Sequence, residues 1–325
     1  MKISFKYFFK LCPILLFFLS NFFVGSLNAD YPEKPITLIT PYAAGGSNDL
    51  TARVFTSYLS DYLGQQMLIK LVPGQAGQKG TLEAIRSVPD GYTLVFTDNY
   101  RDQLHQFTFP NDHYDTNEDL VPVARINYGH IAIIVRGDGP YKTWDDVESD
   151  AKLRPGKLRI SHSGLWAALF VPEWEIMQNL DLRFRMIPYR GGGPAKAALL
   201  SGDVDISMAF PATVAEDVKS GRIRILATAG QERQIFDVPS FTEIGLSATT
   251  GFIHRIVMAP IEMPKDRLLK VRKALKELQN DQRYIDTMRQ MGENVEYMDG
   301  VDYEEVRQQQ SIDYSKLVNS IRVSK

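Results

Sequence analysis

Three short segments of the sequence combine small residues with the expected start of a helix, an arrangement suited to holding an anion. They are Tyr42 to Asp49, Ser161 to Gly164 and Tyr189 to Pro194. Glycine lets a ligand approach the backbone because no Cβ intervenes. The first amides of a helix lack partners within it and carry the positive end of its dipole, which favours a carboxylate or phosphate by roughly 0.3–1 kcal/mol in exposed settings. Each segment alone equally fits an ordinary cap or turn, whereas the set of three favours an anion-binding cleft.

The same segments lack the signatures of common enzymes that handle anions. The stretch from Ala44 matches neither G-x-x-x-x-G-K-[ST] nor G-x-G-x-x-G, which excludes the usual phosphate-binding and dinucleotide-binding loops. The residues around Ser163 do not match G-x-S-x-G. None of the five histidines has H-E-x-x-H or another paired metal-ligand spacing. We therefore expect no catalytic residue, no metal and no cofactor.

Alternating strands and helices must position these segments. The pattern predicts strands at 36–40, 67–72, 93–97, 130–135, 157–161, 184–189, 204–209 and 223–228, with helical patterns between most of them. One helix carries an apolar stripe from Leu50 to Leu63 and ends at Gly64, while Thr143 and Gly202 are a helix cap and a helix stop. This order implies parallel sheets with helices on their faces, and ligands bind at the carboxyl ends of such strands.

The distribution of elements predicts two α/β lobes. The strand at 256–260 is expected to return to the first sheet, and 265–291 forms a long amphipathic helix or a helix pair. We assign residues 30–129 plus 251–325 to lobe 1 and 130–250 to lobe 2. Two crossings between the lobes would then form a hinge beside a central cleft.

The amino terminus predicts export. A basic start precedes an apolar run from Leu11 to Val24, and small or neutral residues lead to Ala29. This layout is typical of a signal peptide over 1–29, cleaved near Ala29. The alternative is an uncleaved membrane anchor, but the run is short and Pro13 interrupts it.

Composition narrows the classes of partner. Cleavage removes three of the 37 basic residues and none of the 39 acidic ones, so the mature net charge becomes −5. A mildly acidic chain without a Lys/Arg-rich stretch argues against binding of nucleic acid. The only cysteine, Cys12, lies in the expected signal peptide, so no disulfide can form afterwards. No later apolar run approaches the length of a membrane span.

Longer motifs resemble one known family. "YPEKPITLITPYAAGGSNDLTARV" resembles the amino terminus of the solute-binding proteins of tripartite tricarboxylate transporters, the Bug family. "SVPDGYTLVFTDN", "LRPGKLRISHSG", "IPYRGGGPAKAALLSGDVDIS" and "KSGRIRILATAGQER" follow in the family's order. The resemblance implies a type II periplasmic-binding-protein fold, with two α/β lobes, a hinge and a central ligand cleft. It further implies a monomeric, non-enzymatic periplasmic protein that binds a small organic acid and delivers it to a membrane permease.

The resemblance also implies ligand contacts, mostly through backbone amides and waters. Those in the first lobe are Tyr42, Ala44, Gly45, Ser47, Asn48 and, at the cleft mouth, Asn99. Those in the second lobe are Ser161, Ser163, Gly164, Tyr189, Gly191, Gly192 and Gly193.

Four residues depart from the family pattern and are candidate specificity residues: Arg101, Trp166, His254 and Arg255. Trp166 belongs to an expected helix start at Leu165. If the four face the cleft, an extra cation and an indole would suit a second carboxylate or an aromatic ring. Alternatively, they face solvent or the surface of a lobe. Arg190 occupies a position that is basic in the family and is expected to be structural or exposed.

Two other functions stay open at this point. The fold would equally allow an extracytoplasmic sensor that signals to a membrane kinase. An exported hydrolase would use Ser163 with His162 or His254, although no orienting acid is evident.

Overall fold

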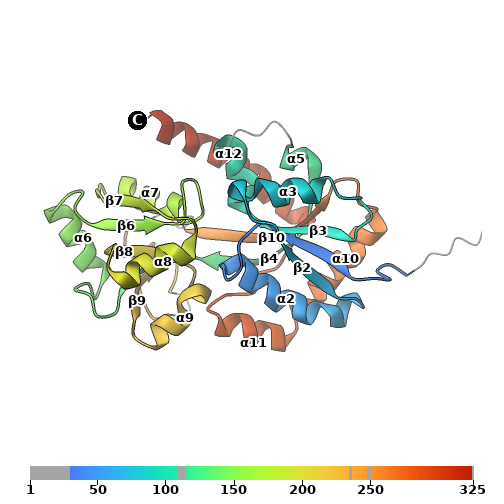
Figure 1. Ribbon diagram of the computed structural model, residues 1–325, viewed down its shortest axis with the longest axis horizontal. Coiled ribbons are helices and arrows are strands. Elements are labelled where there is room, and N and C mark those ends of the chain that lie inside the picture. The colour runs from blue at the N-terminus through green and yellow to red at the C-terminus, as the bar shows by residue number, and fades with distance from the viewer. Residues whose placement is uncertain (1–29, 109–113, 234–235, 247–250, 324–325) are drawn as a thin grey trace, which may run out of the picture.

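The computed structural model describes residues 30–108, 114–233, 236–246 and 251–323. The expected signal peptide, residues 1–29, lies outside the described residues. The chain forms two α/β lobes, each built on its own mixed sheet (Figure 1). Lobe 1 is on the right of this view and lobe 2 on the left.

The sheet of lobe 1 has the strand order β11-β4-β10-β3-β1-β2. Its strands are β1 (Ile36–Thr40), β2 (Met67–Leu71), β3 (Thr93–Asp98), β4 (Leu120–His130), β10 (Phe252–Pro260) and β11 (Met298–Asp299). β1 runs parallel to both β2 and β3, so their carboxyl ends meet at one edge of the sheet. β10 pairs antiparallel with β3 and β4, which confirms the predicted return of 256–260 to the first sheet.

Helices cover both faces of this sheet. They are α2 (Ser47–Leu63), η1 (Gln75–Gly77), α3 (Gln78–Ile85), η2 (Tyr100–Leu104), α4 (His105–Thr108), α5 (Thr116–Asp119), α10 (Lys265–Leu278) and α11 (Gln282–Gln290). Phe55 and Leu59 of α2 pack with Leu275 of α10 in the core of the lobe. Gly64 ends α2 in the left-handed conformation (φ 80°), as its position predicted. The expected helical stretch 265–291 is a helix pair, α10 and α11.

The sheet of lobe 2 has the order β7-β6-β8-β5-β9. Its strands are β5 (Ala132–Arg136), β6 (Arg159–His162), β7 (Arg185–Pro188), β8 (Ile206–Ala209) and β9 (Ile223–Thr228), and its helices are α6 (Trp144–Leu153), α7 (Phe170–Asn179), α8 (Gly192–Ser201) and α9 (Pro211–Lys219). Thr143 caps α6 in a capping box with Asp146, and Gly202 ends α8 with φ 83°, so both predicted helix signals are confirmed.

In the part of the chain that the structure describes, a third segment joins the lobes besides the two crossings expected from the sequence. β4 continues into β5 through Ile131, whose amide donates to the carbonyl oxygen of Gly251 (2.9 Å), and β9 leads back toward β10. The third segment is α12 (Gly300–Val323), which runs from lobe 1 toward α7 of lobe 2 (Figure 1). Tyr303 packs in the core of lobe 1, whereas Val318 and Ile321 belong to the core of lobe 2.

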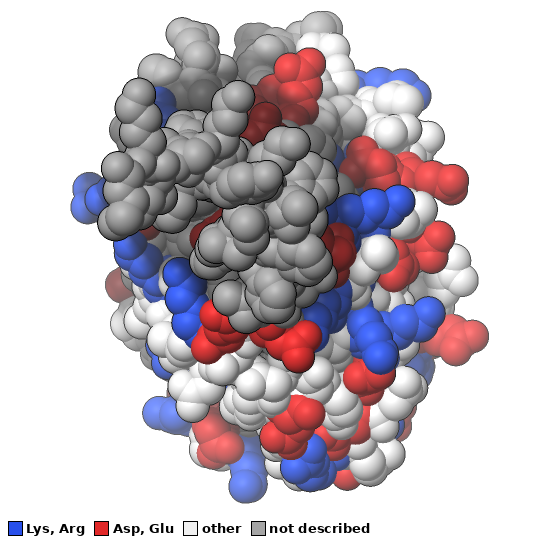
Figure 2. Space-filling view, turned by 90° about the vertical axis from the view of Figure 1, so that its right-hand side faces the viewer, with Lys and Arg blue, Asp and Glu red and all other residues white. Residues whose placement is uncertain are grey.

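The end of lobe 1 that faces away from lobe 2 carries charges of both signs. Outside the grey atoms, basic and acidic side chains are interspersed on this face (Figure 2). Within the described residues, no helix is both long and apolar enough to cross a bilayer.

Candidate functional site

The first predicted anion segment leads from β1 into the amino end of α2. Gly45 has φ 76° and Gly46 is the residue that precedes the helix; Gly46 has no side chain with which to cap it. The amides of the first turn therefore stay available to a ligand at the positive end of the helix dipole. Asp49, in that first turn, accepts from the Gly45 amide (2.8 Å) and pairs with Arg53 (2.9 Å), so its charge is already engaged.

A buried carboxylate, Asp98 at the end of β3, fixes this segment in place. One oxygen accepts from the Tyr42 hydroxyl and from Asn48 Nδ2 (2.9 Å). The other accepts from the backbone amide of Arg101 (3.0 Å). Asp98 thus connects the first segment to the loop after β3, and the sequence patterns did not single it out.

Arg255 lies behind Asn48 in the protein core. Its Nε donates to Asn48 Oδ1 (2.8 Å), and its Nη1 and Nη2 donate to the two oxygens of Glu293 (2.8 and 3.1 Å). The side chains of Arg255 and Glu293 are both 0% exposed. Arg255 therefore orients the Asn48 amide, and Glu293 neutralises the charge of Arg255. The Arg255 side chain faces neither solvent nor the surface of a lobe.

The second and third segments lie side by side in lobe 2. β6 and β7 are parallel neighbours, and the Tyr189 amide donates to the carbonyl oxygen of His162 (2.9 Å). A Cβ on Gly164 would lie 3.7 Å from the carbonyl oxygen of Tyr189. Gly191, with φ 110°, precedes α8 and has no side chain with which to cap the helix. α8 therefore presents a second amino end with available amides.

The second segment does not lead directly into a helix, contrary to the expectation. α7 begins at Phe170, whereas a helix start was expected at Leu165. Trp166 has φ 60°, a left-handed conformation that interrupts helical geometry. The residue is 7% exposed, and its ring packs edge-on against Phe170, with 5.4 Å between ring centroids.

Two further predicted residues, Ser161 and Asn99, have side chains engaged within the protein. Ser161 Oγ donates to Ser207 Oγ (2.8 Å) and lies 3.2 Å from the carbonyl oxygen of Ala195, in the interior of lobe 2. Asn99 Nδ2 donates to the Tyr314 hydroxyl (2.5 Å), while its Oδ1 accepts from the His254 amide (2.9 Å). Ser163 is half-buried, Ala44, Gly192 and Gly193 are exposed, and Arg190 is exposed as expected.

His254 belongs to a buried aromatic cluster. Its ring lies 4.6 Å from that of Tyr128 and 5.7 Å from that of Tyr303. Burial, assisted by the positive charge of Arg125, lowers the pKa of His254 to about 3. The imidazole is therefore neutral at physiological pH and supplies no cation.

Arg101 packs against the first segment. Its guanidinium carbon lies 4.1 Å from the centroid of the Tyr42 ring, a cation–π arrangement. Its Nε and Nη1 are shielded from solvent and have no hydrogen-bond acceptor among the described residues. Of the four departures from the family pattern, Arg101 alone combines a charge with this lack of a partner.

The lobes meet beside these loops. His105, at the start of α4, donates through Nε2 to the carbonyl oxygen of Trp166 (3.3 Å). On the other side, the Arg255 guanidinium lies 5.1 Å from the ring of Phe210, which precedes α9. In Figure 1 the amino end of α2 lies on the side of lobe 1 that faces lobe 2.

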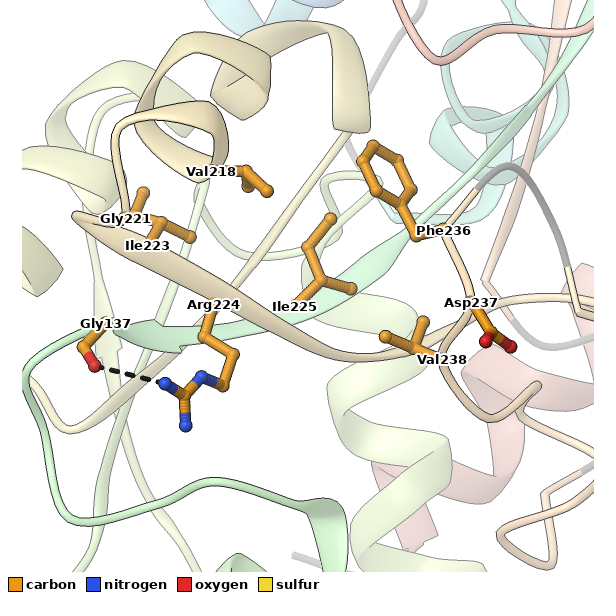
Figure 3. Close-up of a pocket in the computed structure, with 9 residues that line it drawn as sticks. All are labelled: Gly137, Val218, Gly221, Ile223, Arg224, Ile225, Phe236, Asp237 and Val238. Carbon is orange, nitrogen blue, oxygen red and sulfur yellow. Dashed lines mark hydrogen bonds between the residues drawn. The ribbon is translucent and has the colours of Figure 1, made fainter.

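A separate hollow of about 520 Å³ lies along β9, at the edge of the lobe 2 sheet (Figure 3). Ile223, Ile225 and Val238 line it, and Arg224 at its rim donates to the Gly137 carbonyl oxygen (3.5 Å). None of the predicted contacts lines this hollow, and we do not assign the ligand to it. Among the described residues, no group of His, Cys, Asp or Glu is placed to hold a metal ion.

Known proteins share this sequence and fold. Residues 51–323 match the model of the tripartite tricarboxylate transporter family receptor. BugT of Bordetella pertussis is 30% identical over 254 residues, which cover 77% of this chain and 78% of BugT. A solved structure described as a periplasmic transporter is 27% identical with a TM-score of 0.83, covering 89% of this chain and 97% of that one. An R. palustris protein solved with adipate shares the fold at 21% identity, with a TM-score of 0.83 and coverage of 89% and 98%.

These findings confirm the two-lobe fold and the resemblance found in the sequence motifs. The chain belongs to the tripartite tricarboxylate transporter receptor family, the Bug proteins, which are periplasmic solute-binding proteins.

Proposed function

We propose that this protein captures a small organic carboxylate between its lobes and delivers it to a membrane permease of the tripartite tricarboxylate type. The observation that carries the proposal is the pair of helix amino ends, α2 in lobe 1 and α8 in lobe 2, that no side chain caps. Each helix follows a strand that has a parallel neighbour in its sheet, and a glycine residue directly precedes each helix. Two such ends favour one anion held between them.

Closure of the lobes follows from the same arrangement. Each helix end alone offers a weak site, so a ligand that contacts both ends favours the state in which the lobes are shut. The boundaries that we propose for the lobes are 30–129 plus 251–325 and 130–250, although the last turns of α12 pack on lobe 2, and we propose the hinge at the crossings near Ile131 and Gly251. The R. palustris protein of the same fold was solved with adipate, which supports a carboxylate as the ligand class.

We propose that the mature protein begins after Ala29, acts in the periplasm and is monomeric. Delivery is tested by uptake of a radiolabelled ligand into cells with and without the gene. Loss of uptake on deletion supports transport. Unchanged uptake together with a lost transcriptional response to the ligand would instead indicate the sensor function.

Binding is tested by thermal denaturation of residues 30–325 with monocarboxylates, dicarboxylates, tricarboxylates and the matching neutral amides. At about 100 times its Kd, a ligand adds roughly 2.7 kcal/mol of stability, or about 5 °C in the thermal midpoint. We expect this shift with one or more carboxylates and not with the amides. A carboxylate that is chemically converted during incubation, as followed by NMR, would contradict the proposal and favour the hydrolase.

Gly193 offers a variant that tests the site without disturbing the fold. A Cβ there meets no atom within 4 Å, and Gly193 is not among the residues with positive φ. Gly193→Asp places a carboxylate in the first turn of α8, which favours the helix but competes with an anionic ligand. We expect Gly193→Asp to fold and to lose carboxylate binding, whereas Gly193→Asn retains most of it. Equal binding by the two variants would contradict a site at α8.

A further inference from the structure

The guanidinium of Arg101 is held at the carboxyl ends of β1, β2 and β3. The residue follows β3 in η2, and its side chain folds back over the Tyr42 ring at 4.1 Å. On another side it packs against Gly77 of η1, where a Cβ would lie 2.7 Å from Arg101 Cδ. Tyr42 and Gly77 therefore fix the position of the guanidinium beside the loop that leads into α2.

This charge lacks the counter-ion that the two fully buried arginines, Arg255 and Arg307, have. Arg255 pairs with Glu293, and Arg307 pairs with Asp102 at 2.7 Å. Asp102, the next residue in sequence, is paired with Arg307, and Asp98 accepts from Tyr42, from Asn48 and from the backbone amide of Arg101, but not from its guanidinium. Among the described residues, Arg101 Nε and Nη1 find no acceptor although both are shielded from water.

Guanidinium N–H groups that are shielded from water and have no acceptor are unfavourable, and this applies to Nε and Nη1 of Arg101. A ligand carboxylate would supply the missing acceptor, and arginine suits a carboxylate because its planar N–H groups match the two oxygens.

Lobe 2 contacts the helical turn that follows Arg101. His105, which follows Arg101 by four residues, contacts the carbonyl oxygen of Trp166. Burial and the positive charge of Arg101 lower the pKa of His105 to about 3, so this imidazole is neutral. Among the described residues near this contact, Arg101 is therefore a cation without a paired carboxylate, and it lies beside the loop that leads into α2.

We propose that Arg101 binds the second carboxylate of a small dicarboxylate whose first carboxylate is held by the amino ends of α2 and α8. This inference rests on the proposed function, because it assigns the far end of a ligand bound at the same site. Arg101 then acts as the specificity residue that separates dicarboxylates from monocarboxylates of equal length.

The test compares matched ligands by isothermal titration calorimetry of residues 30–325. Succinate, glutarate and adipate are compared with butyrate, pentanoate and hexanoate in the wild type, Arg101→Gln and Arg101→Lys. Arg224→Gln is the control, because Arg224 lies in lobe 2 on the edge strand β9. We expect at least one dicarboxylate to bind the wild type about tenfold or more tightly than its monocarboxylate partner.

In Arg101→Gln this preference should vanish through loss of dicarboxylate affinity, with monocarboxylate affinity within about threefold of the wild type. Arg101→Lys should retain part of the preference, and Arg224→Gln should retain all of it. The thermal midpoint of ligand-free Arg101→Gln should be unchanged or higher, because the variant removes an unpaired charge. A lower midpoint together with an equal loss for both ligand classes would show a structural role and overturn the inference.

The two proposals fail in different ways. Binding of monocarboxylates with no preference for dicarboxylates in the wild type overturns the role of Arg101 and leaves carboxylate capture intact. A wild type that binds no carboxylate at all overturns both.

Discussion

The buried pair of Arg255 and Glu293 should make a large contribution to stability once one partner is removed. Glu293 accepts from both terminal nitrogens of Arg255 and from Asn127 Nδ2 (3.0 Å). Neither side chain of the pair is exposed. Glu293→Gln leaves the guanidinium without an anion inside the protein, and breaking such a buried pair reduces stability by about 3–5 kcal/mol.

Urea unfolding of residues 30–325, followed by tryptophan fluorescence, measures this loss. At roughly 2–3 °C per kcal/mol, the thermal midpoint should fall by about 6–15 °C. The matched control is Asp61→Asn, which breaks an ion pair with Arg283 whose side chains are 61% and 55% exposed. An exposed pair of this kind contributes about 0–1 kcal/mol.

A second variant separates the ion pair from the surrounding packing. Replacing both partners, with Arg255→Met and Glu293→Leu, removes the unpaired charge. The double variant should be more stable than Glu293→Gln, even though Asn48 and Asn127 each lose a hydrogen bond of about 1 kcal/mol. A loss below about 1 kcal/mol for Glu293→Gln, or a double variant no more stable than the single one, would refute this reasoning.

Three further predictions concern single side chains. Glu173→Gln should raise stability by about 1 kcal/mol or more at pH 8, because burial raises the pKa of this carboxyl well above 4.5, with no hydrogen-bond partner among the described residues; the gain should disappear in urea unfolding below pH 4.5, and an equal gain at both pH values would contradict it. The pKa of His254 is about 3 in the folded protein and near 6.5 in the unfolded chain, so the free energy of unfolding should fall by about 1.5 kcal/mol as the pH is lowered from 6.5 to 5. His254→Phe should make the free energy of unfolding, measured in urea, less dependent on pH over that range, and an unchanged pH dependence would exclude this cause. Gly77→Ala should push Arg101 away and weaken adipate binding, measured by calorimetry, about tenfold. The control Gly64→Ala also has positive φ, but its Cβ meets no atom within 4 Å, so adipate affinity should be unchanged. Equal affinities in the two variants would rule out a role for the contact between Gly77 and Arg101.

Local patterns were sufficient for most of the fold. Short apolar runs predicted most strands of the two sheets, since buried parallel strands read as continuous apolar segments, but β4 (Leu120–His130) and β11 (Met298–Asp299) were not predicted. Gly64 and Gly202 predicted helix ends because few other residues adopt the left-handed conformation at low cost. The long helix α12 was not predicted. Its first half packs in lobe 1 through Tyr303 and its second half in lobe 2 through Val318, so no single apolar stripe runs along it.

The candidate site was predictable at the level of backbone segments and less so at the level of side chains. Glycine-rich loops identify helix amino ends directly, and α2 and α8 begin where such loops end. Whether Arg255 is free or paired depends on Glu293, which lies 38 residues away in the chain, and no local pattern links the two. The helix start expected at Leu165 failed because Trp166 adopts a left-handed conformation that residue type alone does not disclose.

The most direct test is a crystal structure of residues 30–325 with a carboxylate that raises the thermal midpoint. The proposal predicts ligand oxygens within hydrogen-bond distance of first-turn amides of both α2 and α8, with Arg101 at the far end of a dicarboxylate. A ligand held by one lobe alone, or seated in the hollow along β9, would contradict capture between the lobes.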